Sequence, residues 1–354
     1  MIKYIGSKRT LLPHITAAFS DLPKRARVLD LFTGTTRVAQ GLKALALHVH
    51  ANDHNRYAWM NARCYVAADR DSVTGRATEV LATLQDTSPA AGWFTKRYCH
   101  EARFFHPDNG AHIEGIRNRI ATLDLDPELE AVALVSLMEA ADRVDSTTGV
   151  QMAFLKQWAK RAHNPLQLRM PSLLPGDGTA SCEDALTCAR SFEGEAAYLD
   201  PPYNQHSYRA NYHVWETLIR WDNPEVYGVV QKRMDCREYK SDFNSKRRIE
   251  AAFRAVVKAC TVPRMVVSFN NEGFLGQDLI ESILAERGHV ATVVLDNKRY
   301  VGAQIGIYSP DGRVVGKISH TRNKELLYIV DTEGDRADAA AARAASAVGA
   351  SISG

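Results

Sequence analysis

The chain has 354 residues, a formal net charge of +3 and 45% hydrophobic residues, enough to bury one large α/β core and a smaller module. No apolar run is long and uncharged enough for a membrane span, and the first residues lack the apolar core of a signal peptide. Six scattered cysteines without a CxxC pair and twelve histidines without ligand spacing favour free thiols in a reducing cytoplasm and argue against a zinc site or a catalytic metal.

The first predicted unit is a strand, a tight turn and a helix. Residues 27–32 form an apolar run that predicts a buried strand, Thr33 to Thr36 form the turn, and residues 37–43 have a helical pattern. Such a turn lets a nucleotide-like ligand approach bare backbone, although a loop with one glycine is common in α/β proteins. A second strand at residues 47–50 leads to Asp53, about 20 positions beyond the turn, where a carboxylate can accept from both hydroxyls of a ribose.

A helical module is predicted next. A helix at residues 54–68 completes the first α/β half. Prolines separate the patterns that follow, and no strand signal of comparable strength lies between them. Residues 69–176 contain twelve Lys or Arg against fourteen Asp or Glu, a slight acidity that is unfavourable for DNA contact. Either a small basic face meets DNA, with Lys96, Arg97 and Arg103 or with Arg117 and Arg119, or the reading of the sequence is shared with the loops downstream of Tyr203. The predicted helices are residues 73–84, 111–123, 128–144 and 151–162.

Acidic residues follow each predicted parallel strand. A short strand at residues 179–182 ends at Asp184 before a helix at 185–190, and the strand at residues 196–199 ends at Asp200. Ligands of doubly wound sheets bind beyond the carboxyl ends of the strands. We therefore expect four carboxylates on one rim of the sheet, those of Asp30, Asp53, Asp184 and Asp200.

The segment Asp200-Pro201-Pro202-Tyr203 has the chemistry of a rigid cup for a flat base with an exocyclic amine. The prolines stiffen the loop, so the Asp200 carboxylate and the Pro201 carbonyl can both accept from one NH2 group. Two acceptors outside the ring plane would relocalise the nitrogen lone pair toward an electrophile, while Tyr203 could stack on the base. The structural alternative is a proline turn with a solvent-facing Asp and a packing Tyr.

Basic residues are concentrated downstream of this segment. Residues 201–264 contain twelve Lys or Arg against seven Asp or Glu, densest at residues 239–248. Asn244 or Ser245 is the predicted N-cap of a helix from Ile249, whose first turn would offer a phosphate site; the alternative is a solvated helix start. The loop of residues 204–212 either closes over an extruded base or is simply polar. The nucleic-acid-binding candidates are His206, Tyr208, Arg209, Lys240, Lys246, Arg247 and Arg248.

The remaining elements complete the sheet. Strands are predicted at residues 264–269, 290–295 and 326–330, with a helix at 279–287 and a β-hairpin formed by 304–308 and 314–318. Lys298 and Arg299 could touch DNA or be solvated. From residue 332 the Ala-rich end predicts a frayed helix or a disordered tail.

Taken together, these motifs resemble the D12 class of adenine-specific DNA methyltransferases, which includes Dam-like enzymes. The resemblance covers residues 1–330. Residues 3–8 resemble the N-terminal cofactor segment of that family, and residues 30–35 its glycine loop. Asn52 and Asp53 resemble its ribose-binding acid, and the segment from Asp200 to Tyr203 its catalytic motif. Thr36 departs from the pattern, which usually has a second glycine there, and this leaves the loop geometry open.

The resemblance implies a Rossmann-like S-adenosylmethionine-dependent methyltransferase fold, with a mixed, mostly parallel seven-stranded sheet. Residues 1–68 and 177–331 would form the catalytic domain, and the helical insert of residues 69–176 would hold the target-recognition region. The implied catalytic residues are Asp200, Pro201, Pro202 and Tyr203. The implied cofactor-binding residues are Lys3, Tyr4, Gly6, Ser7, Asp30, Phe32, Thr33, Gly34, Thr35, Thr36, Asp53, Asp184 and Asp200, with Lys8 nearby.

The hypothesis from the sequence is therefore a site-specific N6-methyltransferase that acts on a flipped-out adenine in double-stranded DNA, in a bacterial cytoplasm and at the nucleoid. The alternatives are adenine methylation in structured RNA and a catalytically idle nucleic-acid-binding relative. A nicotinamide dehydrogenase is disfavoured because the GxGxxG fingerprint is missing. A cognate restriction endonuclease is a further partner that such an enzyme can have. Monomeric action is compatible with this class, but no pattern sets the oligomeric state.

Overall fold

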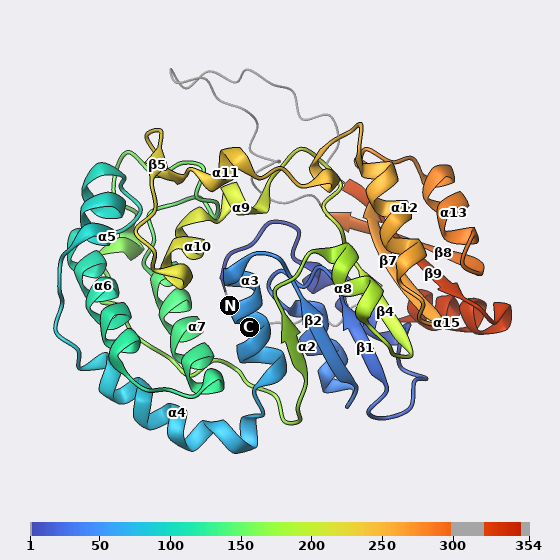
Figure 1. The fold of residues 1–354 in the computed structure, drawn as a ribbon, viewed down its shortest axis with the longest axis horizontal. Coiled ribbons are helices and arrows are strands. Elements are labelled where there is room, and N and C mark those ends of the chain that lie inside the picture. Colours follow the sequence, from blue (N-terminus) through green and yellow to red (C-terminus); the bar gives the residue numbers. More distant parts are fainter. Residues whose placement is uncertain (1, 299–321, 348–354) are drawn as a thin grey trace.

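The computed structural model describes residues 2–298 and 322–347. Its centre is a seven-stranded sheet with the order β3-β2-β1-β4-β7-β9-β8. Strand β9 runs antiparallel to the other six strands, which all run in one direction. This arrangement confirms the predicted Rossmann-like methyltransferase fold (Figure 1). The strands are β1 (Arg27–Asp30), β2 (His48–Asn52), β3 (Thr179–Ser181), β4 (Ala196–Leu199), β7 (Arg264–Asn270), β8 (His289–Lys298) and β9 (Arg322–Asp331).

Alternating side chains of the central strands enter two apolar layers, as the period of a strand requires. Val28 packs on one face of the sheet and Leu29 on the other, and Tyr198 and Leu199 repeat this alternation in β4. Because both faces are covered, the central strands consist of continuous apolar runs. One face carries α1 (Leu12–Ala17), α2 (Arg37–Ala44) and α15 (Gly334–Ser346), and the other carries α8 (Ala185–Ser191), α12 (Ile249–Ala259) and α13 (Gln277–Ala285).

A helical lobe lies beside the sheet and has a third apolar core (Figure 1). Helix α10 (His213–Arg220) belongs to this core, so the lobe includes chain from beyond the predicted insert of residues 69–176. A two-stranded hairpin, β5 (Val226–Tyr227) and β6 (Lys232–Arg233), follows α10. The other lobe helices are α3 (Arg56–Ala62), η2 (Arg63–Ala67), α4 (Arg70–Gln85), α5 (Trp93–Thr95), η3 (Lys96–Glu101), α6 (Pro107–Thr122) and α7 (Pro127–Arg143).

Short helices occupy the connections between the larger elements. They are η1 (Lys8–Thr10), η4 (Lys160–His163), α9 (Tyr208–Asn211), α11 (Asp235–Glu238) and η5 (Asp242–Asn244). Within residues 2–298 and 322–347, no helix has the length and apolar character needed to cross a bilayer.

The predicted helix at residues 151–162 is wrong, because only its last residues form the short η4 turn. Tertiary hydrogen bonds take the groups that a helix would need. Gln151 donates its backbone N–H to the Asn211 carbonyl at 2.9 Å and accepts from Val214 N–H through its side chain at 2.8 Å. Leu155 N–H donates to the Ser146 carbonyl at 2.9 Å. The two bonds of Gln151 fasten the start of this segment to α9 and α10.

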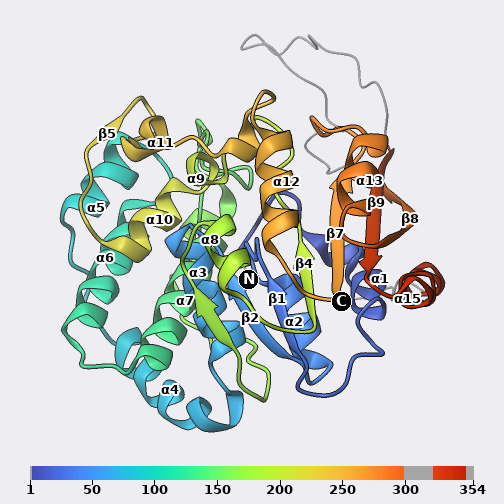
Figure 2. The ribbon, with the colours of Figure 1, turned by 45° about the vertical axis from the view of Figure 1, so that its right-hand side comes forward.

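The end of the chain also differs from the expectation of a frayed or disordered tail from residue 332. Residues 334–346 form α15, and its Ala337, Ala340 and Ala344 are buried against α1 and β8. Small side chains at helical spacing let the two helices approach closely, and Figure 2 shows α1 and α15 side by side. The His14 ring nitrogen Nδ1 lies 2.7 Å from the Ala344 carbonyl oxygen. The predicted hairpin at residues 304–318 lies outside the described residues, as does Arg299.

Candidate active site

A pocket opens at the carboxyl ends of the parallel strands β1, β2 and β4, where the sequence predicted a ligand. Its empty space, counted to the open mouth and including solvent there, is about 800 Å³. The predicted residues that line it are Tyr4, Gly6, Ser7, Asp30, Phe32, Thr33, Gly34, Thr35, Asp53, Asp200, Pro202, Tyr208 and Arg209.

The turn after β1 holds two left-handed residues. Gly34 has φ +52°, and a Cβ on it would lie 3.2 Å from the Tyr4 hydroxyl oxygen. Thr36 has φ 62° and is fully buried, although its side chain carries a Cβ. Its hydroxyl donates to the Thr35 carbonyl at 2.6 Å and accepts from Gln40 Nε2 at 2.8 Å. The residue that replaces the usual glycine therefore faces the start of α2 and does not narrow the pocket.

Asp30 is a buried carboxylate at the base of the pocket. Its Oδ2 accepts from the Thr33 hydroxyl at 2.8 Å and from Ala39 N–H at 3.1 Å. Its Oδ1 has no hydrogen-bond partner among the described residues. Burial raises the pKa of Asp30 to about 7, against the hydrogen bond from Thr33. A cationic group of a ligand would satisfy Oδ1 and lower this pKa again.

Asp53 is held in place by the turn that it faces. Its Oδ2 accepts from Gly34 N–H at 3.1 Å, and its Oδ1 accepts from the backbone and side-chain amides of Asn55 at 2.9 and 3.0 Å. Each carboxylate oxygen can accept more than one bond, so the orientation fixed here leaves capacity for hydroxyl donors. The contact of Asp53 with a ribose stays a prediction, and the carboxylate that would accept from the hydroxyls is already oriented.

Asp200 is paired with a buried lysine. Lys8 Nζ lies 3.0 Å from Asp200 Oδ1, and the Lys8 side chain is only 7% exposed. Burial raises the pKa of Asp200 to about 6, although Lys8 opposes this shift. Burial alone would lower the pKa of Lys8, but the Asp200 and Glu325 carboxylates raise it well above its usual value. Near pH 7 both partners are therefore charged, and Asp200 is an acceptor.

The other members of the tetrapeptide occupy different environments. Pro202 lines the pocket, whereas Pro201 is buried. The Tyr203 carbonyl accepts from Phe274 N–H at 2.9 Å, and the half-buried Tyr203 ring is not part of the pocket lining. The hydrogen bond from Phe274 fixes the loop. Because the Tyr203 ring does not line the pocket, its stacking on a base stays a prediction.

Three tyrosines form one wall of the pocket region. The Tyr4 ring stacks on Tyr208, at 5.2 Å between centroids, and on Tyr212, at 4.6 Å, and these two rings lie 6.4 Å apart. The Tyr212 hydroxyl accepts from Ile5 N–H at 2.7 Å. The N-terminal segment is thereby fastened to α9, which explains how residues 4–8 reach a pocket built from the strand ends.

Several predicted residues lie elsewhere. Lys3 forms ion pairs with Asp142, in the last turn of α7, and with Asp145, just after it, at 3.2 and 3.1 Å. Asp184 is exposed and caps α8 by accepting from Leu186 N–H at 2.9 Å. The predicted N-cap of α12 is wrong: Arg248 holds that position, and neither Asn244 nor Ser245 caps the helix through its side chain. Outside the lining, with exposed side chains, lie His206, Lys240, Lys246, Arg247 and Arg248.

The two basic faces that were predicted for the helical module differ in how far their side chains are exposed. Arg117 is buried, donates to the Leu218 and Ile219 carbonyls at 2.8 and 3.0 Å and lies over the Trp221 ring. Arg117 is therefore a structural residue of the lobe. Lys96 is exposed, Arg97 and Arg103 are half-buried, and Arg103 lies over the Trp158 ring at 4.5 Å.

The pocket also contains residues that were not predicted to line it, among them Arg37, Asn55, Tyr239 and Asn244. No periodic signal marks them, because loops from distant parts of the chain bring them together. Asn244 Nδ2 donates to the Asn204 carbonyl at 2.8 Å and to the His206 carbonyl at 3.1 Å, which holds the loop after Tyr203.

The unpaired polar atoms around this pocket are complementary to a ligand that combines an amino acid with a nucleoside. Besides Asp30 Oδ1, the buried atoms Arg37 Nε, Asn55 Oδ1 and Arg209 Nε have no hydrogen-bond partner among the described residues. The ammonium group of a ligand can donate to Asp30 Oδ1, and its carboxylate can accept from an arginine. The residues present thus fit S-adenosylmethionine. Among the described residues, no group of three or more His, Cys, Asp or Glu side chains could hold a metal ion.

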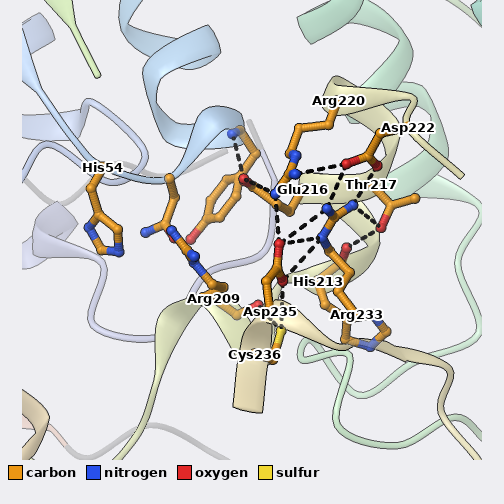
Figure 3. Close-up of polar contacts among 12 residues, drawn as sticks. His54, Arg209, His213, Glu216, Thr217, Arg220, Asp222, Arg233, Asp235 and Cys236 are labelled. Atoms are coloured by element: carbon orange, nitrogen blue, oxygen red, sulfur yellow. Dashed lines mark hydrogen bonds and ion pairs between the residues drawn. The ribbon is translucent and has the colours of Figure 1, made fainter. Parts of the chain in front are cut away.

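A network of ion pairs supports the rim of the pocket (Figure 3). Arg233 is 1% exposed and donates to both Asp222 oxygens at 2.7 Å, and it also contacts Asp235. The next residue, Cys236, lies with Sγ 3.7 Å from the Arg209 carbonyl oxygen. Arg209 lies over the Tyr239 ring at 4.4 Å. The hairpin and α11 therefore hold the part of the rim that carries Arg209 and Tyr239.

Comparisons with known proteins agree with this geometry. A family model described as D12 class N6 adenine-specific DNA methyltransferase matches residues 4–258. Type II methyltransferase M.NlaIII of Neisseria lactamica is 30% identical over 315 residues, 84% of this chain and 92% of its own length. Modification methylase StsI of Streptococcus sanguinis is 29% identical over 303 residues, 80% of this chain but 46% of its own length. Type II methyltransferase M.CviAII of Paramecium bursaria Chlorella virus 1 is 26% identical over 329 residues, with 88% and 95% covered.

Proposed function

Since this chain belongs to the D12 class of N6 adenine-specific DNA methyltransferases, we propose that its pocket binds S-adenosylmethionine beside a target adenine that has left the DNA helix. The activity of the family is transfer of a methyl group from a donor to N6 of adenine in DNA. The observation that carries the proposal is the Asp200 carboxylate, held by Lys8 at 3.0 Å on the wall of a pocket that the glycine turn also lines.

The pocket side chains that would hold the cofactor differ in charge. Asp30 offers an unpaired oxygen to an ammonium group, Arg37 offers an unpaired N–H to a carboxylate, and Asp53 offers its carboxylate to ribose hydroxyls. When bound, S-adenosylmethionine supplies a methyl group on a sulfonium centre. The left-handed glycine at position 34 lets the Tyr4 ring lie against the turn, since a Cβ there would be 3.2 Å from the Tyr4 hydroxyl oxygen.

Asp200 would act on the target amine as a hydrogen-bond acceptor. Its pKa of about 6 leaves it ionised near pH 7, and the stiff Pro201 and Pro202 hold the adjacent backbone in place. The Asp200 carboxylate and the Pro201 carbonyl would each accept from one N–H of the amine. Positioning of this kind supplies most of the rate in a methyl transfer that needs no covalent enzyme intermediate.

The polar rim would hold the flipped adenine and the DNA backbone. Tyr208 and Tyr239 line the pocket with aromatic surface, and Arg209, which lies over the Tyr239 ring, adds a cation to the lining. Base flipping requires such a pocket, because the amine of a stacked and paired adenine is out of reach. The exposed basic residues after η5, Lys246, Arg247 and Arg248, would contact phosphates. The helical lobe would share the reading of the target sequence.

The biological role that we propose is modification within a restriction system. Several relatives are named type II methyltransferases or modification methylases. A chain of this kind would methylate the site that a cognate endonuclease cuts and so protect the DNA of its host.

A methyl-transfer assay tests the proposal. The purified chain receives labelled S-adenosylmethionine together with duplex plasmid DNA or ribosomal RNA, and sequencing that detects N6-methyladenine then identifies the site. We expect label in the DNA only. For Asp200→Ala we expect a loss of about 10²–10³-fold in turnover, with cofactor affinity nearly unchanged. The control, Asp278→Ala, changes an exposed aspartate on α13. Near wild-type transfer by Asp200→Ala would refute the role of Asp200, and label in RNA alone would refute the substrate.

A further inference from the structure

Lys8 lies between two carboxylates that come from different strands. Its Nζ is 3.0 Å from Asp200 Oδ1, at the end of β4, and 3.5 Å from Glu325 Oε2, in β9. The side chain of Glu325 is 10% exposed and that of Lys8 is 7% exposed. Glu325 does not line the pocket, and it lies beyond the residues matched by the family model. One buried cation is thus shared by a carboxylate that faces the ligand and another that does not.

The surroundings of Glu325 leave Lys8 as its main charged partner among the described residues. Asn270 Nδ2 donates to Glu325 Oε1 at 3.4 Å, a long hydrogen bond. Glu325 Oε2 has no hydrogen bond among the described residues and only the ion pair to Lys8. A buried carboxylate is costly unless it is paired, so this arrangement needs a compensating role or an exact charge balance. With one lysine and two carboxylates, the cluster has a net charge of −1.

We propose that Glu325 is a positioning residue for methyl transfer, which shares the Lys8 ammonium so that Asp200 remains a strong hydrogen-bond acceptor for the target amine. The inference rests on the proposed role of Asp200. Without Glu325, Asp200 would be the only counter-ion of Lys8 among the described residues, and a fully neutralised carboxylate accepts a hydrogen bond from an aryl amine less strongly.

The electrostatic effects on Asp200 have the signs that this role requires. Burial contributes most to the raised pKa of Asp200, Lys8 lowers it, and Glu325 raises it again. Loss of the Glu325 charge therefore lowers the pKa of Asp200. Lys8 keeps its charge in either case, because each carboxylate raises its pKa. Other titratable groups that act on Asp200 or Lys8, or on which Asp200 acts, are Asp30, Tyr198, Tyr203 and Tyr208.

Glu325→Gln tests the inference, because it removes the charge and keeps the shape. The pH profile of kcat is measured with duplex DNA for the wild type, Glu325→Gln, Glu325→Asp and the control Glu333→Gln, which changes an exposed residue just after β9. We expect kcat at pH 7 to fall about tenfold in Glu325→Gln, with the KM for S-adenosylmethionine unchanged. We expect its acid limb to move to lower pH by about one unit. Glu325→Asp should recover part of the rate.

A second readout does not depend on turnover. The carboxyl resonance of Asp200 is titrated by ¹³C NMR, with Asp200→Asn for its assignment, and thermal unfolding shows that each variant folds. A lower Asp200 pKa in Glu325→Gln than in the wild type supports the inference. An unmoved Asp200 pKa together with wild-type kcat refutes it. Failure of the proposed function looks different, because the wild type would then transfer no methyl group to adenine while the NMR comparison still reports on Glu325.

Discussion

Replacement of Lys8 by methionine removes the cation and keeps most of the side-chain volume. Two unit charges 3.0 Å apart attract by about 5 kcal/mol at an effective dielectric constant of about 20. Much of this attraction offsets the cost of desolvation, so a loss of about 3–5 kcal/mol in the free energy of unfolding is expected when one partner of the buried pair is removed. Asp200 and Glu325 are then left as two buried carboxylates without a counter-ion.

The same substitution changes the pH dependence in a defined direction. The pKa of Asp200 is about 6 in the folded wild type, above its value of about 4 in an unfolded chain. The folded state therefore binds this proton more tightly, and stability falls as the pH rises from about 4 to about 6. Without Lys8 the folded pKa rises further, so in Lys8→Met this decline extends to higher pH. The acid limb of methyl transfer moves to higher pH as well, opposite to its shift in Glu325→Gln.

Urea unfolding at pH 5, 7 and 8, together with the pH profile of methyl transfer, measures both effects. The control is Lys258→Met, which changes an exposed lysine on α12 and should alter stability by less than about 0.5 kcal/mol. If Lys8→Met unfolds at the same urea concentration as the wild type at pH 7 and its acid limb does not move, the ion pair with Asp200 does not set the charge of the site.

Two further substitutions address the cofactor turn and the DNA face. Gly34→Ala places a Cβ 3.2 Å from the Tyr4 hydroxyl oxygen at φ +52°. We therefore expect a loss of about 1–2 kcal/mol in the free energy of unfolding and weaker binding of S-adenosylmethionine, measured by calorimetry. The control Gly75→Ala, in open space on α4, should bind the cofactor as the wild type does. Simultaneous replacement of Lys246, Arg247 and Arg248 by glutamine should reduce the slope of log Kd against log salt for duplex DNA by up to about 3, and an unchanged slope would show that these side chains are only solvated.

The sheet and its acidic rim could be predicted because their signals are local. The alternation of Val28 and Leu29 and the turn after Asp30 are set by neighbours in the chain, and the parallel order then brings Asp53 and Asp200 to the same edge. Each of these features depends on strand periodicity and on one packing rule.

The contacts that could not be predicted join residues far apart in sequence. The pairing of Lys8 with Glu325 joins the N-terminal segment to β9, near the other end of the sequence, and neither residue type indicates a partner. The helical pattern near Gln151 was overridden by bonds to α10, which helical propensity does not describe. The alanines of α15 suggested a tail because each has a small apolar area. This area stabilises a helix by packing only when a second helix lies close, as α1 does.

The helical lobe is discontinuous in the chain, and under our proposal that the lobe shares the reading of the target sequence, this limits how such proteins could exchange specificity. Its core takes α3 to α7 from before the strand that carries Asp200 and α10 from after it. Recombination of residues 69–176 between relatives would deliver half of an interface and leave α10 to meet foreign side chains. New target preferences in this lineage are thus expected to arise by point substitution, or by paired exchange of both stretches. An engineer who grafts a lobe must transplant residues 207–240 along with the insert.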